Sequence, residues 1–435
     1  MSQTTGTDMH ADFVIVGGGA GGLLLAARLG RKLGRRHGRR RVLLIDRTPI
    51  HIWKPSLHEI AAGTLDAHQE GLSYPMLARR NHFKFSLGDM AGLDVGAKRL
   101  TLAEMRDEDG RVIVPERVVG FERLVLATGS GSNLFGTPGA AEHARLLEDT
   151  DDARDFQQRL TTAFMATAFS DERVLRIAIV GAGATGVELS AELLEAHDAF
   201  QEALAHDQQF RLEVTIVEMA PRILGGLPER VADQAAAALA QKGVRVMTEA
   251  KVERVRADGL NTSKGDVPAD LTVWAAGVKA DERNTTFGLK TGKLNQFVTD
   301  DRLRTSAPGI WAMGDCAEIP GPDGRPLPAR AQAAAQQADY LTEALLADAS
   351  GRSGGRAFIY RDRGSLVALG EDEAAGSLMG GLLGDRFFIE GLMARWAYMS
   401  LHLDHHRRIL GPVRTAVLAL ARLMHDRISG RLKLH

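Results

Sequence analysis

The stretch Asp12-Phe-Val-Ile-Val-Gly-Gly-Gly-Ala-Gly-Gly22 decides the fold of this chain. Its first five residues have the composition of a buried β-strand. The glycines then lead into a helix-like stretch, which is followed by a second strand over Arg41–Asp46. A strand, a glycine turn, a helix and a further strand make up the βαβ unit of a parallel sheet. The N-terminal part is therefore predicted to be an α/β domain with a doubly wound parallel sheet.

The same pattern occurs a second time along the chain. The strand Ile177–Val180 runs into Gly181-Ala-Gly-Ala-Thr-Gly186, a helix-like stretch follows, and Glu213–Glu218 has the pattern of the next strand. A single GxGxxG sequence is a weak signal. Two copies are a strong one when each lies between a strand and a helix and is followed by a strand that ends in an acid. We expect two Rossmann-like dinucleotide-binding domains.

Each glycine loop is suited to a dinucleotide, because glycines let the backbone approach a pyrophosphate bound at a helix N-terminus. The acid at the end of the second strand is suited to ribose hydroxyls and repels the 2′-phosphate of NADPH, so NADH is favoured, with Arg222 opposing that preference. Glu218 lies 32 residues past Gly186, longer than the usual ~20, which we attribute to an insertion over 197–211. The residues concerned are Gly17, Gly19, Gly22 and Asp46 in the first loop and Gly181, Gly183, Gly186 and Glu218 in the second.

Two apolar runs that end at glycine turns, Leu124–Gly129 and Thr272–Gly277, close the two units. Ile310–Cys316 then has the pattern of a buried strand that leads into a polar Gly-Asp turn before an alanine-rich helix. The second unit is therefore expected to be inserted in the first. The expected boundaries are 10–170 and 286–348 for the first domain, 171–285 for the second, and 356–435 for a C-terminal domain.

Composition excludes several classes of protein. The chain has 435 residues and a net charge of −1, which gives no reason to expect nucleic acid as a partner. Cys316 is the only cysteine, so an internal disulfide and a CxxC motif are excluded and a reducing compartment is expected. We expect no signal peptide at the N-terminus, and no apolar run reaches the ~18–20 residues needed to cross a bilayer.

The two loops, the Ala-Thr-Gly sequence 127–129 and the Gly-Asp turn together resemble the flavin-dependent pyridine-nucleotide oxidoreductases. In that family the first loop holds FAD, the second holds NAD(P)H, and the acid of the Gly-Asp turn binds the ribityl chain of the flavin. A single cysteine excludes the disulfide-reductase branch and the sulfide-oxidising relatives. The resemblance implies FAD contacts at Gly17, Gly19, Ala20, Gly21, Gly22, Asp46, Lys54, Met90, Thr128, Gly129, Asp315 and Ala331, and NADH contacts at Gly181, Gly183, Thr185, Gly186, Glu188, Glu218, Ala276 and Gly277.

Five further stretches narrow the resemblance: His51-Ile-Trp-Lys-Pro-Ser-Leu-His-Glu59, Gly183–Ser190, Ala329–Gln336, Gly364–Val367 and Arg431–His435. Together they resemble the bacterial type II NADH dehydrogenases, which are single-subunit NADH:quinone oxidoreductases. The resemblance implies FAD-dependent oxidation of NADH with two-electron reduction of a membrane quinone to quinol, without proton pumping, in a respiratory chain. Two other functions stay open: a soluble reductase of a small protein electron carrier, and a non-catalytic redox sensor that binds FAD and NADH.

The same resemblance implies three residues at the reaction centre. Gln332 and Gln336 belong to a helix that the family places against the flavin, and Ala335 stands where relatives often carry a histidine. Glu188 is implied to approach the nicotinamide and the flavin. The ordinary alternatives are surface glutamines, a glutamate that only interacts with the helix dipole and, for Lys54, a solvated lysine.

The C-terminal sequence predicts a basic amphipathic helix on an anionic lipid surface, preceded by Trp396 and Tyr398 at the interface. The alternative is a helix packed on the protein's own core or on a second copy in a homodimer. The resemblance implies a peripheral protein on the cytoplasmic face of the bacterial inner membrane. The apolar stripe consists of Leu410, Val413, Val417, Leu420, Met424 and Ile428, and the surrounding cations are Arg407, Arg408, Arg414, Arg422, Arg427, Arg431 and Lys433.

Two polar clusters are expected to be solvated. His402, His405 and His406 stand at the start of the membrane-facing segment, and no metal site is expected there. The run Arg28–Arg41 carries eight Lys or Arg and no acid. It is expected to be a solvated loop, with a second lipid or partner contact as the alternative.

Overall fold

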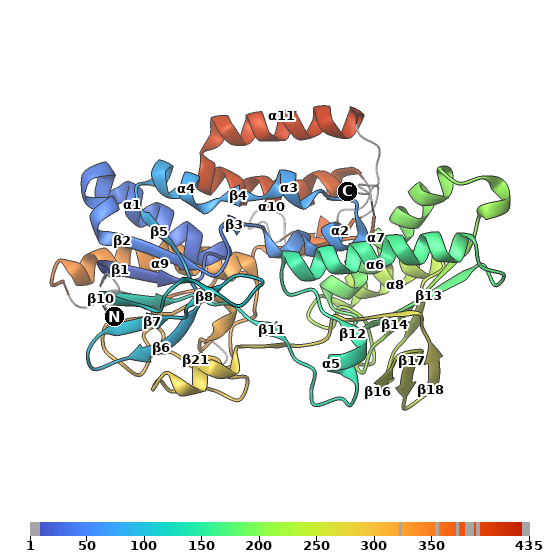
Figure 1. The fold of residues 1–435 in the computed structure, drawn as a ribbon, viewed down its shortest axis with the longest axis horizontal. Coiled ribbons are helices and arrows are strands. Elements are labelled where there is room, and N and C mark those ends of the chain that lie inside the picture. The colour runs from blue at the N-terminus through green and yellow to red at the C-terminus, as the bar shows by residue number, and fades with distance from the viewer. Residues whose placement is uncertain are drawn as a thin grey trace.

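The computed structural model describes residues 9–321, 324–352, 356–370, 374–378, 387–388 and 392–428. A mixed sheet and a parallel sheet lie side by side, each covered by helices (Figure 1). The helices α10 (Leu392–Leu410) and α11 (Pro412–Ile428) are stacked along one face of the molecule, with α11 outermost (Figure 1). The predicted α/β architecture with two Rossmann-like sheets is confirmed.

The first sheet is built around β10, which pairs with β1 in parallel along most of its length. The N-terminal part of β10 also pairs antiparallel with β7, and its C-terminal part pairs in parallel with β22. Because β22 follows the whole second sheet in sequence, the second unit is inserted in the first, as predicted. The strands, in order across the sheet, are β5 (Lys84–Leu87), β2 (Val42–Asp46), β1 (Met9–Val16), β10 (Arg117–Leu126), β7 (Arg99–Leu102) and β6 (Met90–Asp94), with β22 (Ile310–Ala312) beside β10.

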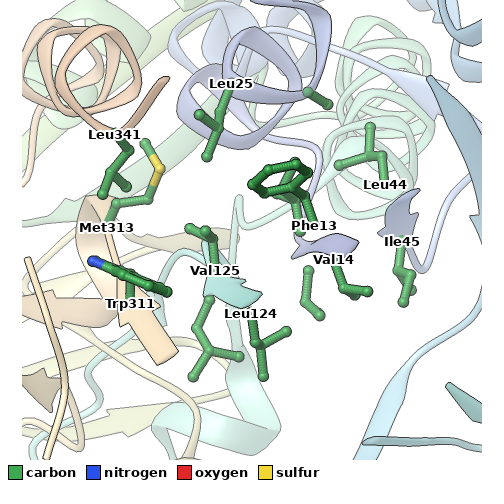
Figure 2. Packing of buried hydrophobic residues seen from close by; sticks show 14 of the residues in the cluster. Phe13, Val14, Leu25, Leu44, Ile45, Leu124, Val125, Trp311, Met313 and Leu341 are labelled. Carbon is green, nitrogen blue, oxygen red and sulfur yellow. The ribbon is translucent and has the colours of Figure 1, made fainter. Parts of the chain in front are cut away.

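The core of the first domain lies between this sheet and two helices, α1 (Ala20–Arg41) and α9 (Ala331–Ala349). Phe13 of β1 and Leu44 of β2 point toward the helices, where they meet Leu25 of α1 and Leu341 of α9, whereas Val14 points to the other face of the sheet (Figure 2). Each such side chain contributes roughly 1.5–3 kcal/mol by leaving water. This packing holds the start of α1 rigidly at the carboxyl ends of the parallel strands.

The second sheet is entirely parallel, and its β13 and β14 carry the repeated pattern. The chain enters this sheet at β12, well before residue 171, where the sequence places the boundary. The sequence places the boundary too late because the short strand β12 and the amphipathic helix α6 (Thr150–Ala168) contain no glycine motif that marks the start of the second domain. The order is β12 (Ala144–Arg145), β19 (Leu271–Trp274), β13 (Val174–Val180), β14 (Arg211–Val217) and β15 (Arg245–Met247), covered by α6, α7 (Ala184–Glu202) and α8 (Glu229–Gln241).

Smaller elements complete the two domains. The antiparallel sheet β16 (Val252–Arg256), β17 (Gly259–Thr262) and β18 (Gly265–Pro268) packs on the second domain. The paired short strands are β3 (Ile50–His51) with β4 (Leu72–Ser73), β8 (Met105–Arg106) with β9 (Val112–Val114), β11 (Gly131–Ser132) with β20 (Val278–Lys279), and β21 (Phe297–Val298) with β23 (Ala317–Glu318). The short helices are α2 (Leu57–Ala62), α3 (Ala67–Glu70), α4 (Tyr74–Asn81) and α5 (Ala140–His143), with single 3₁₀ turns at Lys54–Ser56, His206–Gln208, Glu282–Thr286 and Gly314–Cys316.

The basic run Arg28–Arg41 is helical and not the expected loop, although most of its cations are exposed, as expected. It forms the second half of α1, which bends at Gly34, a residue with φ +74°. Arginine and leucine favour helix, and partners on other elements take up several of the charges. Arg28 pairs with Asp339 of α9 at 2.8 Å, and Arg31 donates to the backbone carbonyl of Arg408 at 2.9 Å.

The C-terminal region begins with an antiparallel sheet of β24 (Gly364–Ala368), β25 (Ala374–Leu378) and β26 (Phe387–Phe388). The expected single helix from Leu410 onward is interrupted, because Gly411 with φ +84° ends α10 and Pro412 begins α11. No helix in the described part of the chain is long and apolar enough to cross a bilayer. The terminal motif 431–435 and the side chains of Trp396, Tyr398, Arg422, Arg427 and Ile428 lie outside the described residues.

Candidate functional site

The first glycine loop has the geometry of an anion-binding turn. Gly17 has φ +101°, and a Cβ on Gly22 would lie 1.9 Å from the carbonyl oxygen of Gly17, so neither position accepts a side chain. Gly19, by contrast, has no atom within 4 Å of the place a Cβ would occupy. Gly19 is also the N-cap of α1, with no side chain capping the helix. The N–H groups of the first turn therefore face an open space that suits a pyrophosphate.

The second loop repeats this geometry residue by residue. Gly181 has φ +105°, and a Cβ on Gly186 would lie 2.0 Å from the carbonyl oxygen of Gly181. Gly183 is open and uncapped at the N-terminus of α7, with Thr185 exposed just behind it. The two loops are thus two copies of one dinucleotide-binding motif.

The two acids also occupy equivalent places. Asp46 at the end of β2 accepts a hydrogen bond from the N–H of Gly18 at 2.6 Å, and Glu218, directly after β14, accepts one from the N–H of Ala182 at 2.7 Å. Each carboxylate is therefore fixed at the edge of its glycine loop, as a ribose-binding acid must be. The guanidinium of Arg222 donates to the carbonyls of Gly225 and Leu227, so it is engaged within its own loop.

A two-stranded ladder joins the domains where both sheets end. Ala127–Gly129 leads into β11 and Ala275–Gly277 leads into β20, and these strands pair antiparallel. The indole of Trp274 donates to the carbonyl of Asn133 at 3.0 Å and so ties the second sheet to the segment after β11. Because the carboxyl ends of parallel strands hold the ligands of such sheets, the ladder brings the two nucleotide edges together.

Lys54, Ser130 and Asp315 meet at the edge of the first sheet. The ammonium of Lys54 donates to the carbonyl of Ser130 at 3.0 Å, and the Ser130 hydroxyl donates to Asp315 at 3.2 Å. Burial lowers the pKa of Lys54 and raises the pKa of Asp315. Lys54 is thus held in the site, while Ser130, which the sequence did not single out, bridges the two charges. Gly129 beside them has φ +75° and open space around it.

The glutamines of α9 divide between two neighbours. Gln332 donates to the carbonyl of Gly364 at 2.8 Å, and Gln336 donates to the carbonyl of Arg361 at 2.8 Å, so both hold the segment before β24. Buried Gln337 accepts from the N–H of Gly314 at 2.7 Å and so orients the Gly-Asp turn. The sequence does not single out Gln337, because a third glutamine on an alanine-rich helix carries no signal of which face is buried.

Glu188 lies at a junction of three elements. It is 7% exposed, its Oε1 accepts from the N–H of Ala368 in β24 at 3.2 Å, and its Oε2 lies 3.7 Å from Nδ1 of His58 in α2. Burial raises the pKa of Glu188 well above its ordinary value and lowers that of His58 to about 4. His58 is therefore neutral near pH 7, and burial favours the protonated form of Glu188. A glutamate that only interacts with the helix dipole would be exposed, and this one is not.

The other residues implied at the cofactors are spread along the same two edges. Met90 is buried at the start of β6, Ala331 is the first residue of α9, and Thr128 and Gly277 are exposed beside the ladder. A shallow hollow bounded by Gln296, Gly314, Asp315, Arg330, Ala333 and Gln337 lies next to the Gly-Asp turn. The open glycines and the uncapped helix starts make both edges fit for dinucleotides.

Comparison with known proteins agrees with this geometry. The family described as pyridine nucleotide-disulphide oxidoreductase matches residues 11–338. A type II NADH:quinone oxidoreductase of Haemophilus influenzae is 35% identical over 97% of this chain and 99% of its own length. A type II NADH:quinone oxidoreductase of Staphylococcus aureus is 28% identical over 84% of this chain and 89% of its own.

The solved structure of NDH2 from Plasmodium falciparum in complex with NADH shares the fold. It has a TM-score of 0.81 at 16% identity, and the match covers 97% of this chain and 99% of that one. The chain therefore belongs to the pyridine nucleotide-disulphide oxidoreductase family and, within it, to the type II NADH:quinone oxidoreductases.

Proposed function

We propose that the chain oxidises NADH bound at the second glycine loop and reduces a quinone, with FAD held at the first loop. The observation that carries this assignment is the pair of equivalent loops whose edges meet at the β11–β20 ladder. Two dinucleotides bound there would extend toward one place. FAD, when bound, supplies the two-electron chemistry between the donor and the acceptor.

The chain's own contribution is binding and orientation. The open N-termini of α1 and α7 are suited to the two pyrophosphates, and Asp46 and Glu218 are suited to the two riboses. Lys54 and Asp315 supply one positive and one negative group to the flavin edge, and Gln337 keeps the Gly-Asp turn in position. Gln332 and Gln336 hold the segment 361–364 against the start of α9.

Glu188 is the buried acid of this junction, and burial raises its pKa and so favours its protonated form. Its Oε1 accepts the backbone N–H of Ala368, which leaves Oε2 on the side of His58. Quinone reduction consumes two protons, and a buried acid with a raised pKa is suited to supplying one of them. We therefore assign Glu188 to the reaction centre, with His58 as the residue that orients it.

Lipid attachment through α11 is part of the proposal. Val413, Val417, Leu420 and Met424 recur at helical spacing and are 74%, 63%, 59% and 58% exposed. Leu410, expected to begin this stripe, instead packs on the first core. Burial, and then the guanidinium of Arg414, lower the pKa of Arg80. A like-charged pair next to an apolar stripe is suited to an anionic lipid surface.

The decisive experiment follows the absorbance of the purified yellow protein in a stopped-flow instrument. Anaerobic NADH is expected to bleach the flavin within one turnover. A short-chain quinone is then expected to restore the colour much faster than dissolved oxygen does. A protein that NADH does not bleach would refute the assignment of the second loop. Reoxidation by quinone no faster than by oxygen would refute the quinone assignment.

A further inference from the structure

The three histidines of α10 are buried, and the expectation that they are solvated is wrong. His402, His405 and His406 are 7%, 8% and 2% exposed. They face the segment 51–73 of the first domain rather than solvent: His402 packs edge-on against the ring of Trp53, and His405 lies against His51. Sequence periodicity could not show this, because the break at Gly411 turns α10 away from the direction of the apolar stripe.

The histidines form two neighbouring groups, with the rings of His405 and His406 5.8 Å apart where the groups meet. Nε2 of His405 lies 2.9 Å from Nε2 of His51, whose Nδ1 is 3.0 Å from the carbonyl oxygen of Gly18 in the first glycine loop. His402 and His406 instead stand one helical turn apart, with parallel rings whose centroids are 4.6 Å apart. Buried Glu70 at the end of α3 faces this second pair.

The second group has the dimensions of a metal site. Nε2 of His402 lies 3.4 Å from Oε2 of Glu70, and one donor atom from each of Glu70, His402 and His406 lies within 4.8 Å of the others. Tetrahedral zinc with bonds of about 2.0–2.2 Å separates its ligand atoms by roughly 3.3–3.6 Å. The first pair is already at that separation, and the third donor needs to move by roughly 1 Å.

The chemistry of the donors fits as well. Nδ1 of His406 lies 3.0 Å from the carbonyl oxygen of His402, and a hydrogen bond donated there leaves Nε2 as the nitrogen that carries the lone pair. Metal-binding histidines are generally oriented by such a bond. Burial lowers the pKa of both His402 and His406 to about 4, so both imidazoles are neutral donors near pH 7. Two imidazoles at i and i+4 with one carboxylate form a recognised zinc set with a fourth position for water.

We propose that Glu70, His402 and His406 bind a zinc ion that fastens α10 to α3. The ion would link the helix that carries α11 to the domain that carries the first glycine loop. The three protein ligands and a water in the fourth position would hold together α3 and α10, which are far apart in the sequence. This proposal does not depend on the quinone assignment.

The first test measures metal in the full-length, FAD-loaded protein without a histidine tag. The protein is dialysed against a chelator, titrated with zinc chloride against a competing indicator, desalted and analysed by plasma mass spectrometry. We expect one tightly held zinc per chain and a thermal midpoint that rises by a few degrees with zinc. X-ray absorption at the zinc edge should show nitrogen and oxygen ligands without sulfur. Sulfur ligation, or no zinc retained, would overturn the proposal.

Variants locate the site. Glu70→Gln and His406→Ala are each expected to weaken zinc binding at least tenfold and to remove the zinc-dependent rise of the midpoint. His405→Gln on the same helix is the matched control and should keep one zinc per chain. Unchanged zinc affinity in the double variant His402→Ala/His406→Ala would mean that the ion binds elsewhere and would overturn the assignment. If a variant does not fold, the titration and the absorption spectrum of the natural protein decide the question.

Discussion

The carboxylate of Glu218 accepts backbone hydrogen bonds on both of its oxygens, from the N–H of Ala182 and the N–H of Ala220, each at 2.7 Å. A charge fixed in this way cannot move aside for a 2′-phosphate. We predict that Glu218→Gln, which keeps an acceptor for Ala182 and removes the charge, lowers the ratio of kcat/KM for NADH over NADPH by on the order of tenfold, which corresponds to about 1.4 kcal/mol.

The equivalent change in the first loop is the control for that measurement. Asp46→Asn should weaken FAD retention and leave the NADH/NADPH ratio of the remaining flavin-loaded protein unchanged. An unchanged ratio in Glu218→Gln would show that this carboxylate does not discriminate between the two nucleotides.

The buried carboxyl of Glu188 makes the folded protein less stable as pH rises. Burial raises its pKa well above 4.5, so the folded protein keeps a proton that the unfolded chain releases. The free energy of unfolding therefore falls as pH rises from 4.5 toward the raised pKa, by about 1.4 kcal/mol per pH unit. Glu188→Gln keeps an acceptor for Ala368 and cannot ionise.

The variant should therefore gain thermal midpoint relative to the natural protein as pH rises from about 5 to about 8. The difference between the two proteins should become constant well below pH 4.5, where the carboxyl is protonated in both the folded and the unfolded chain. A difference that does not change with pH would contradict a raised pKa at this position.

Two consecutive glutamines of α9, Gln336 and Gln337, point to different neighbours. Gln337 is buried against the Gly-Asp turn, whereas Gln336 binds the segment before β24. Gln337→Leu leaves the N–H of Gly314 without its acceptor, which costs about 1–3 kcal/mol. We predict that this variant releases FAD more readily, as measured by flavin fluorescence after dilution.

Gln336→Leu is the matched substitution on the same turn of α9 and should keep FAD as firmly as the natural protein does. Equal FAD release from both variants would show that the hydrogen bond to Gly314 does not position the flavin edge.

The helix α11 allows a test of lipid binding. The substitutions Val417→Asp and Leu420→Asp place two charges on the apolar stripe. They remove two side chains whose burial in lipid would each contribute roughly 1.5–3 kcal/mol. The partition coefficient for anionic vesicles, measured by sedimentation, is expected to fall at least 100-fold. Reduction of a water-soluble quinone should continue. Val112→Asp with Ile113→Asp, at another exposed apolar pair, is the control.

Two results of that experiment would count against a lipid surface. One is vesicle binding that survives the charges on α11. The other is a natural protein that sediments as a dimer and dissociates when the stripe is charged, which would assign the stripe to a second copy of the chain.

For the molecule as a whole, we expect that a substitution in one glycine loop abolishes nucleotide binding at that loop and leaves binding at the other intact. A Cβ on Gly186 would overlap the carbonyl oxygen of Gly181, and a Cβ on Gly22 would overlap that of Gly17. We predict that Gly186→Ala purifies yellow, is not bleached by NADH, and is still reoxidised by quinone after chemical reduction. Gly22→Ala should purify without flavin. Loss of flavin from both variants would show that the two pockets do not fold separately.

Much of the nucleotide site could be predicted because its signals are local in sequence. Gly17 and Gly181 are followed by an acid at the end of the next strand. The tight turn before each helix requires a glycine at these positions, and this requirement can be recognised without knowing the fold. Gln337, Ser130 and His58 could not be found in this way. Their roles arise from contacts with segments that are distant along the chain, and the motifs beside them do not show which partner each side chain meets.

The two βαβ units and the insertion of one in the other can be predicted from the sequence, because each follows from strand, turn and helix patterns within short stretches. The resemblance to a family, and not these patterns, implied FAD for the first loop. The burial of the α10 histidines and the enclosure of Glu188 by α2 and β24 emerge only in the folded molecule. Burial depends on which distant elements pack together, and packing is a property of the whole fold that local periodicity does not contain.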